Sequence, residues 1–132
     1  MARYQGSCHC GDVRFEIESD LDVVTACNCS ICTKKGFVHL IVQKERFVLK
    51  TPEENLATYT FGTHTAKHHF CRRCGIAPYY RPRSHPDDYD VNVRCLEGVE
   101  LSTLRVQSFD GRRWEDNIAS FRAQVPGEHR GL

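Results

Sequence analysis

The stretch that decides the fold is Cys71-Arg72-Arg73-Cys74-Gly75. Two cysteines separated by two residues and followed by a glycine are typical of a zinc knuckle, because both thiolates can reach one ion at about 2.3 Å. The glycine suits the left-handed backbone conformation that closes such a turn. The stretch therefore predicts one half of a four-cysteine metal site, and the rest of the chain must supply the other half.

The remaining clustered cysteines form two groups nearer the amino terminus. Cys8 and Cys10 share a face in a regular strand, and in a bent loop they can chelate together. A structural zinc takes four protein ligands, which this pair and the knuckle together supply. The other group, Cys27-Asn28-Cys29-Ser30-Ile31-Cys32, offers three ligands and leaves a fourth position open, as in catalytic zinc sites. The count predicts two zinc ions per chain, one structural and one at an active site.

Other uses of the eight cysteines stay open at this level. Four disulfides would use all of them, although a reducing compartment disfavours this. An iron–sulfur cluster could use the group of three with Cys95 as its fourth ligand. A redox pair at Cys71 and Cys74 would need a strand–helix setting that the sequence does not indicate. Cys95 shares the alternating face of Val91 and Val93, so a buried core thiol is its expected role.

Composition narrows the classes of partner. The 132 residues are 40% hydrophobic and 27% charged, and 18 Lys and Arg against 17 Asp and Glu give a formal net charge of +1. A nearly neutral chain without aromatic residues interleaved in a basic stripe is not expected to bind nucleic acid. No apolar run reaches the roughly 18 residues of a membrane helix, and residues 1–7 show no signal-peptide pattern. We therefore expect a cytoplasmic protein without a membrane partner.

The apolar residues recur mostly with a period of two, which favours short strands. Strands are expected at residues 13–17, 37–42, 47–49, 58–61, 68–71, 76–81, 89–96 and 104–109. Single helical turns are expected at 33–36 and 52–56, and no stretch of 11 or more residues shows a convincing helical face. The pattern predicts a small, mainly β, antiparallel fold. Residues 1–124 form its single zinc-stabilised domain, and 125–132 are expected to be a loose carboxy-terminal tail.

Six segments also match the pattern of a known family. They are Gly6-Ser7-Cys8-His9-Cys10-Gly11, Cys27-Asn28-Cys29-Ser30-Ile31-Cys32, Phe61-Gly62-Thr63, His69-Phe70-Cys71-Arg72-Arg73-Cys74-Gly75, Val91-Asn92-Val93-Arg94-Cys95-Leu96 and Phe109-Asp110-Gly111-Arg112. In these the chain resembles the glutathione-dependent formaldehyde-activating enzyme family, which includes the conserved domain of centromere protein V. The resemblance implies a β-tent fold like that of the Mss4 family. It also implies a structural zinc at Cys8, Cys10, Cys71 and Cys74 and a second zinc at Cys27, Cys29 and Cys32.

An open zinc with three thiolates predicts thiol chemistry. An incoming thiol loses its proton when it binds such a metal, and the metal can polarise a carbonyl oxygen. The resemblance implies a carbon–sulfur lyase that adds glutathione to formaldehyde and forms S-hydroxymethylglutathione. Cys27, Cys29 and Cys32 are then the candidate catalytic residues. The alternative is a non-catalytic zinc-stabilised binding module or a carrier of thiols. The chain is short for the formaldehyde-activating members and lacks the basic extension of centromere protein V, so the fold transfers better than the substrate.

Glutathione carries two carboxylates, so its pocket should offer cations. Lys34 and Lys35 directly follow the group of three cysteines and, together with Arg94, are the candidate substrate-binding residues. His39 alternates within an apolar run and is expected to be buried in a strand, with contact to the second metal site as the alternative. The dipeptide His68-His69 is a candidate to brace the four-cysteine site from outside.

Overall fold

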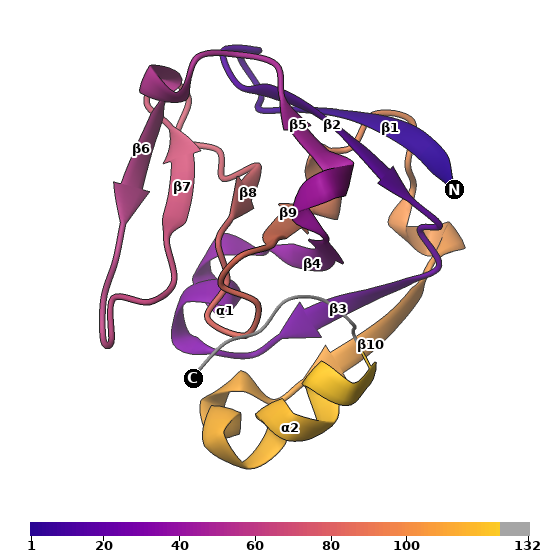
Figure 1. Ribbon diagram of the computed structural model, residues 1–132, viewed down its shortest axis with the longest axis vertical. Coiled ribbons are helices and arrows are strands. Elements are labelled where there is room, and N and C mark those ends of the chain that lie inside the picture. The colour runs from indigo at the N-terminus through magenta and orange to yellow at the C-terminus, as the bar shows by residue number, and fades with distance from the viewer. Residues whose placement is uncertain (125–132) are drawn as a thin grey trace.

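The computed structural model describes residues 1–124 (Figure 1). The strands in this part of the chain are β1 (Ala2–Ser7), β2 (Arg14–Ser19), β3 (Val23–Cys27), β4 (Val38–Val42), β5 (Phe47–Leu49), β6 (Leu56–Tyr59), β7 (His68–Cys71), β8 (Tyr79–Tyr80), β9 (Tyr89–Asn92) and β10 (Arg105–Phe109). The α-helices are α1 (Ser30–Lys35) and α2 (Trp114–Gln124), and short 3-10 turns occupy Lys44–Arg46, Glu53–Asn55, Val93–Cys95, Leu101–Thr103 and Gly111–Arg113. The expected mainly β fold is confirmed.

Two sheets enclose the core. One has the strand order β1-β2-β5, and the other has the order β10-β3-β4-β9-β8. Alternation along β2 turns Phe15 and Ile17 inward, where they meet Val24 and Val91 from the larger sheet. Phe47 of β5 stacks on Phe15 with 5.4 Å between ring centroids. The core therefore covers one face of the larger sheet, and the opposite face remains available for contacts with other parts of the chain.

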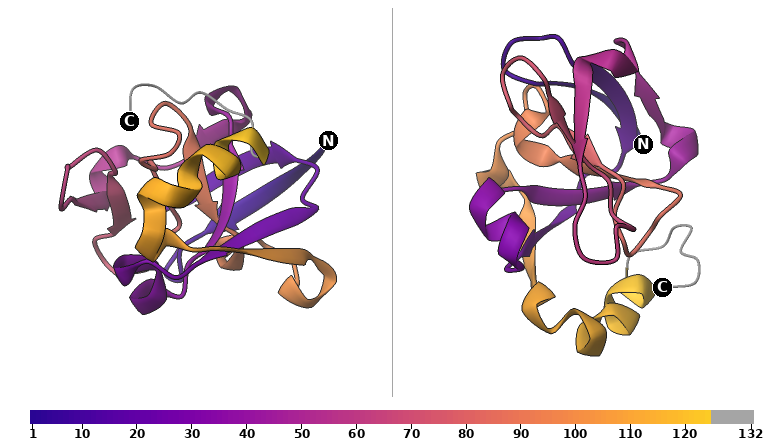
Figure 2. Two further views of the ribbon diagram at one scale, coloured as in Figure 1. Left: turned by 90° about the horizontal axis from the view of Figure 1, so that it is seen from below. Right: turned by 90° about the vertical axis from the view of Figure 1, so that its left-hand side faces the viewer.

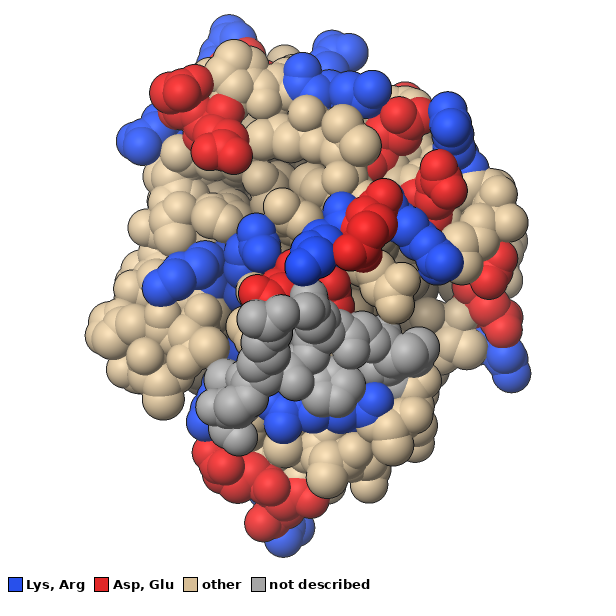
Figure 3. Space-filling view, in the orientation of Figure 1, with Lys and Arg blue, Asp and Glu red and all other residues tan. Residues whose placement is uncertain are grey.

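A third, two-stranded sheet formed by β6 and β7 stands to one side of the other two (Figure 1). Helix α2 lies below β3 and β10 in that view and is seen from two further sides in Figure 2. On the described part of the face in Figure 3, basic and acidic side chains are interspersed, as their near-equal numbers predict. No helix within residues 1–124 is both long enough and apolar enough to span a membrane.

The structure departs from the sequence expectations at several elements. β10 runs parallel to β3, whereas the other strand pairs of the three sheets are antiparallel. The 11-residue helix α2 is not among the elements that the sequence predicts. Only Ile118 of this helix is buried, so its sequence carries a weak helical pattern. The expected tail at residues 125–132 lies outside the described residues.

Cys95 lies in the 3-10 turn after β9, because that strand ends at Asn92 and does not continue to residue 96 as expected. Its side chain nevertheless packs against the core. Burial, followed by the nearby charges of Cys8 and Cys74, raises the pKa of the Cys95 thiol to about 12. The structure thus places this thiol in the protonated, packed state expected of a core cysteine.

Candidate metal centres and the adjoining pocket

The first cysteine cluster joins two tight turns that are far apart in the sequence. Cys8 and Cys10 lie between β1 and β2, while Cys71 and Cys74 lie at the end of β7. The Sγ atom of Cys10 is 3.7 Å from that of Cys8 and 3.6 Å from that of Cys71, and all four sulfurs lie within 4.8 Å of one another. Sulfurs bound to one tetrahedral zinc at 2.3 Å are about 3.8 Å apart. The four thiols therefore suit a closed tetrahedral site.

Backbone groups hold these sulfurs in place. The backbone N–H of Val13 donates to Sγ of Cys8 at 3.3 Å, and that of Cys74 donates to Sγ of Cys71 at 3.5 Å. Gly75 has a φ of +79°, and its N–H donates to the carbonyl oxygen of Cys71 at 2.9 Å. The knuckle predicted from the sequence is thus present, with the glycine in the left-handed conformation that it requires.

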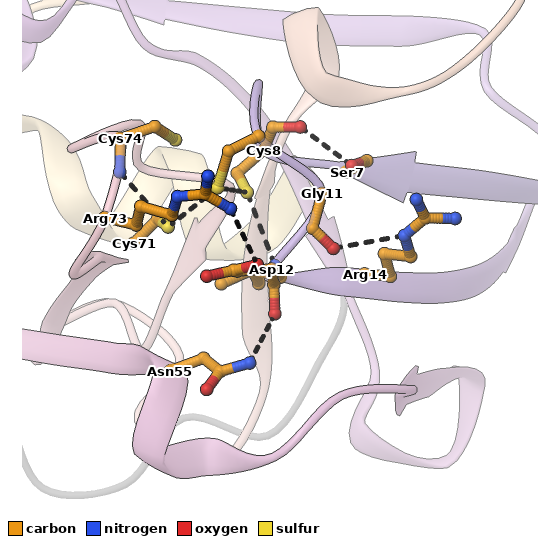
Figure 4. Close-up of polar contacts among 11 residues, drawn as sticks. Ser7, Cys8, Gly11, Asp12, Arg14, Asn55, Cys71, Arg73 and Cys74 are labelled. Carbon is orange, nitrogen blue, oxygen red and sulfur yellow. Dashed lines mark hydrogen bonds and ion pairs between the residues drawn. The ribbon is translucent and has the colours of Figure 1, made fainter.

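Polar contacts outside the sulfurs connect the two turns (Figure 4). The guanidinium of Arg73 in the knuckle lies 3.7 Å from the carboxylate of Asp12 in the amino-terminal turn. The side-chain amide of Asn55 donates to the carbonyl oxygen of Asp12 at 2.7 Å, and the backbone N–H of Arg72 in the knuckle donates to the carbonyl oxygen of Asn55 at 3.0 Å. These contacts link the segments that carry the two pairs of cysteines, so they support the same geometry that a bound ion would stabilise.

The second cluster forms where β3 leads into α1. Cys27 ends β3, Cys29 is the N-cap of α1, and Cys32 lies in the first turn of that helix. The Sγ atom of Cys29 accepts the backbone N–H of Cys32 at 3.4 Å, and the three sulfurs lie within 4.8 Å of one another. This short strand-to-helix junction brings three sulfur donors together on one side of the chain.

The three thiols of the second cluster cannot all ionise without a compensating charge. Contacts with the sulfurs of Cys27 and Cys29, followed by burial, raise the pKa of Cys32 well above its usual range. Hydrogen bonds from Cys27 and Cys32 lower the pKa of Cys29. Two thiols therefore support one thiolate. A divalent cation would allow all three to be thiolates, so this donor set fits zinc.

A pocket of about 470 Å³ opens beside the second cluster. It is lined by all three cysteines of that cluster and by none of the first, and its volume is in the range of small-molecule sites. Much of the remaining wall is aromatic or aliphatic, with side chains from the loop after β6, from β8, from β10 and from α2. These are Phe61, Tyr80, Phe109, Trp114, Ile118 and Phe121.

A buried histidine–aspartate pair stands in the wall of this pocket. Nδ1 of His39 on β4 lies 2.7 Å from Oδ2 of Asp90 on β9, and the side chains are only 5% and 4% exposed. In the neutral imidazole, Nδ1 then donates to the carboxylate and Nε2 carries the lone pair. Among the described residues, Nε2 has no hydrogen-bond partner. The sequence predicts a strand position for His39 but indicates no role for Asp90, since nothing local shows that the two side chains meet.

Lys35, a predicted substrate-binding residue, lies beside the second cluster. Its Nζ atom is 3.3 Å from Nδ1 of His68 and 5.3 Å from the ring centroid of Tyr80, and burial lowers its pKa. His68 lines the pocket, and its ring stacks on Tyr80 at 4.8 Å. The expectation that both histidines brace the first cluster is therefore wrong for His68. Successive residues of β7 face opposite ways, so His69 does not share the direction of His68. The Nδ1 atom of His69 lies 2.8 Å from Oγ1 of Thr58.

None of the three predicted substrate-binding residues is among those that line the pocket, although Lys35 contacts His68 and Tyr80, which do. Lys34 is exposed on α1. Neighbouring positions on a helix differ in direction by about 100°, so Lys34 points away from the face shared by Cys32 and Lys35. Arg94 is exposed in the 3-10 turn after β9. Two arginines that line the pocket instead, Arg83 and Arg112, come from segments far in sequence from the three cysteines of the second cluster.

All eight cysteines lie within the described residues, and all are free thiols. Cys95 belongs to neither cluster, and the cysteines that influence it electrostatically are Cys8 and Cys74 of the first one. It is thus not grouped with the three cysteines beside the pocket. The structure contains neither the disulfides nor the iron–sulfur ligand set that the sequence left open.

Comparison with known proteins agrees with this geometry. A family model described as glutathione-dependent formaldehyde-activating enzyme matches residues 3–109, a range that contains both clusters. Among solved structures, the crystal structure of a Rhodobacter sphaeroides protein is 39% identical in sequence. The match covers 78% of this chain and 99% of that chain, with a TM-score of 0.71. The cysteine clusters, the mainly β fold and these matches together show that the chain belongs to the glutathione-dependent formaldehyde-activating enzyme family.

Proposed function

We propose that this protein is a zinc-dependent carbon–sulfur lyase that acts on adducts of small thiols. Its reaction is the addition of a thiol such as glutathione to formaldehyde, which gives S-hydroxymethylglutathione, and the reversal of that addition. The observation that carries the proposal is a cluster of three sulfurs, without a fourth described donor in the group, that borders a pocket of small-molecule size. Membership of the family supports glutathione and formaldehyde as the substrate class.

Two zinc ions per chain are part of the proposal. The four thiols of the first cluster would hold a structural ion, and Cys27, Cys29 and Cys32 would hold the second. When bound at the second cluster, zinc supplies positive charge that favours the thiolate form of a ligand and polarises a carbonyl oxygen. Free thiols at both clusters require a reducing compartment, so a cytoplasmic location belongs to the same proposal.

Side chains of the pocket would bind the adduct and transfer a proton between its sulfur and its oxygen. The aromatic and aliphatic walls exclude water from the reacting groups. Addition forms one S–C bond and turns the π pair of the carbonyl into a lone pair on oxygen. The proton lost by the thiol sulfur is returned to that oxygen, so neither an oxidant nor a reductant is needed. We assign Nε2 of His39 as the atom that carries this proton, with Asp90 fixing its tautomer.

Metal analysis and a rate measurement test the proposal. Protein purified without a chelator should contain about two zinc ions per chain. Cys29→Ser should retain one ion and a folded chain, whereas Cys74→Ser should lose the fold, because a structural zinc site contributes directly to folding. The matched control is Cys95→Ser, which alters a cysteine outside both clusters. Exchange NMR of glutathione with formaldehyde should show acceleration by the wild type and by Cys95→Ser, and none by Cys29→Ser.

Three outcomes would contradict the proposal in different ways. If the wild type holds a single zinc ion and Cys29→Ser retains it, the protein has no second metal site. Unfolding of Cys29→Ser to the same extent as Cys74→Ser would indicate a purely structural binding module. Saturable binding of glutathione without faster formaldehyde exchange would indicate a thiol carrier.

A further inference from the structure

The turn after β10 is in direct contact with the second cluster. A Cβ atom added at Gly111 would lie 2.4 Å from Sγ of Cys27 and 2.9 Å from Cβ of Cys29. Such distances are much shorter than a van der Waals contact, so only a glycine lets this backbone approach so closely. The turn formed by residues 110–112 is therefore built against the cysteines.

Asn28, which lies between two cysteines of the cluster, holds this turn against the cluster through hydrogen bonds. Its side-chain amide donates to the carboxylate of Asp110 at 3.0 Å, and its side-chain oxygen accepts the backbone N–H of Arg112 at 3.1 Å. Its backbone N–H donates to the carbonyl oxygen of Phe109 at 3.3 Å. Both the backbone and the side chain of one residue thus tie the cysteine loop to the turn.

The same residue orients the guanidinium of Arg112. Nε of Arg112 donates to the carbonyl oxygen of Asn28 at 3.0 Å. Within residues 1–124, no hydrogen bond or ion pair engages the two terminal nitrogens, and the side chain lines the pocket. A guanidinium held through Nε presents its remaining donors in a fixed fork, which matches the two oxygens of a carboxylate.

The second arginine in the pocket wall is already engaged. Arg83 lies 3.0 Å from the carboxylate of Glu115, and its guanidinium lies 3.8 Å from the ring centroid of Trp114. Arg112 has no acidic partner within the described residues. It is therefore the arginine of the pocket wall that a negatively charged substrate group can pair with.

We propose that Arg112 binds a carboxylate of the thiol substrate and so makes the site selective for thiols that bear one. This inference rests on the proposed function in one respect, namely that a thiol binds at the second cluster. Because the arginine is tied to the cysteine loop through Asn28, it places the carboxylate at a defined separation from the sulfur. The site would then distinguish thiols by the position of their charge, and not by the thiol group alone.

Binding of glutathione and its esters to zinc-loaded protein tests this selectivity. Calorimetry should show that the wild type binds glutathione about tenfold more tightly than Arg112→Ala does, because one charge-assisted contact is lost. The diethyl ester should bind the wild type more weakly than glutathione, and Arg112→Ala should bind both compounds alike. The glycyl monoethyl ester identifies which of the two carboxylates is recognised. The matched control is Arg113→Ala, since Arg113 is exposed, pairs with Asp116 at 3.3 Å and does not line the pocket.

Retained discrimination against the diethyl ester by Arg112→Ala would overturn the inference, and so would equal binding of both compounds by the wild type. The wild-type comparison needs no substitution, so it decides the matter even if the variant folds poorly. The wild type, Arg112→Ala and Arg113→Ala should all contain the same amount of zinc. If the zinc-loaded wild type binds neither compound at millimolar concentration, the proposed function itself fails, and that result is distinct from loss of selectivity.

Discussion

His39 and Asp90 form a buried pair in which Nδ1 and Oδ2 are 2.7 Å apart, although they lie on different strands of the larger sheet. An unpartnered buried acceptor such as Nε2 of His39 costs about 1–3 kcal/mol of stability. An apolar pair would avoid that cost. The pair lies in the wall of the pocket that the second cysteine cluster also lines, where an incoming substrate could supply the missing partner.

Asp90→Asn should therefore slow the reaction strongly and lower the stability of the fold only modestly. An amide can donate a hydrogen bond to Nδ1, which favours the wrong tautomer of His39, and the rate of formaldehyde exchange should fall by about 10²-fold or more. The free energy of unfolding should fall by about 1–3 kcal/mol. Exchange NMR, urea unfolding and the ¹⁵N shifts of the imidazole measure the three effects. Asp116→Asn, an exposed change on α2, is the control. An unchanged exchange rate in Asp90→Asn would remove His39 from the reaction.

Gly111→Ala should remove the second metal ion selectively. Its new methyl group would meet Sγ of Cys27 at 2.4 Å, so the turn after β10 or the cysteine loop must move. Zinc content should fall from two ions to one while circular dichroism stays close to that of the wild type. Gly98→Ala is a suitable control, because Gly98 has open space around it and only its φ of +71° is strained by a side chain. Two retained zinc ions in Gly111→Ala would show that the loop tolerates the displacement.

Chelation should remove zinc in two stages. The second cluster borders the pocket, whereas Cys8 and Cys71 of the first are buried and belong to the core cluster. A chelator should extract the ion beside the pocket first, with loss of activity and little change in circular dichroism. Extraction of the other ion should coincide with unfolding, because an ion held by the first cluster would join two distant turns. Loss of both ions in one step, together with the fold, would contradict this order.

Stability should depend on pH through His68. Burial, followed by the charge of Lys35, lowers the pKa of His68 from 6.5 to about 4. Between these values the unfolded chain binds more protons than the folded one, so the free energy of unfolding rises with pH. This contribution is fully present above pH 6.5 and is lost as pH falls towards 4. The slope for one group is at most about 1.4 kcal/mol per pH unit.

Urea unfolding of His68→Gln at pH 7, 6 and 5 should therefore show a flatter dependence than the wild type. Loss of zinc at low pH affects both proteins, so the difference between their slopes isolates the histidine. His64→Gln, on the same hairpin but exposed, should behave like the wild type. Equal slopes for the wild type and His68→Gln would rule out the histidine as the cause.

Features that depend on neighbouring residues were predictable from the sequence. The spacing of Cys71 and Cys74 sets a knuckle, and a period of two sets a strand such as β2. The grouping of cysteines into four and three followed from counting, and the structure places them as two clusters. Helix α2 was not predictable from the sequence, because a helix with one buried residue lacks the apolar stripe from which an amphipathic helix is recognised.

The sequence by itself thus determined the mainly β fold and the two sets of thiols, because spacing within a turn or strand follows from local backbone geometry. Only the tertiary structure decided what surrounds the open set. It brought together His39 and Asp90 from separate strands, and it fastened Arg112 to Asn28 across 84 positions of the chain. It also turned Lys34 away from the pocket while keeping Lys35 beside it. Proximity in sequence gave no guidance there, because strand pairing and helix direction determine which side chains meet.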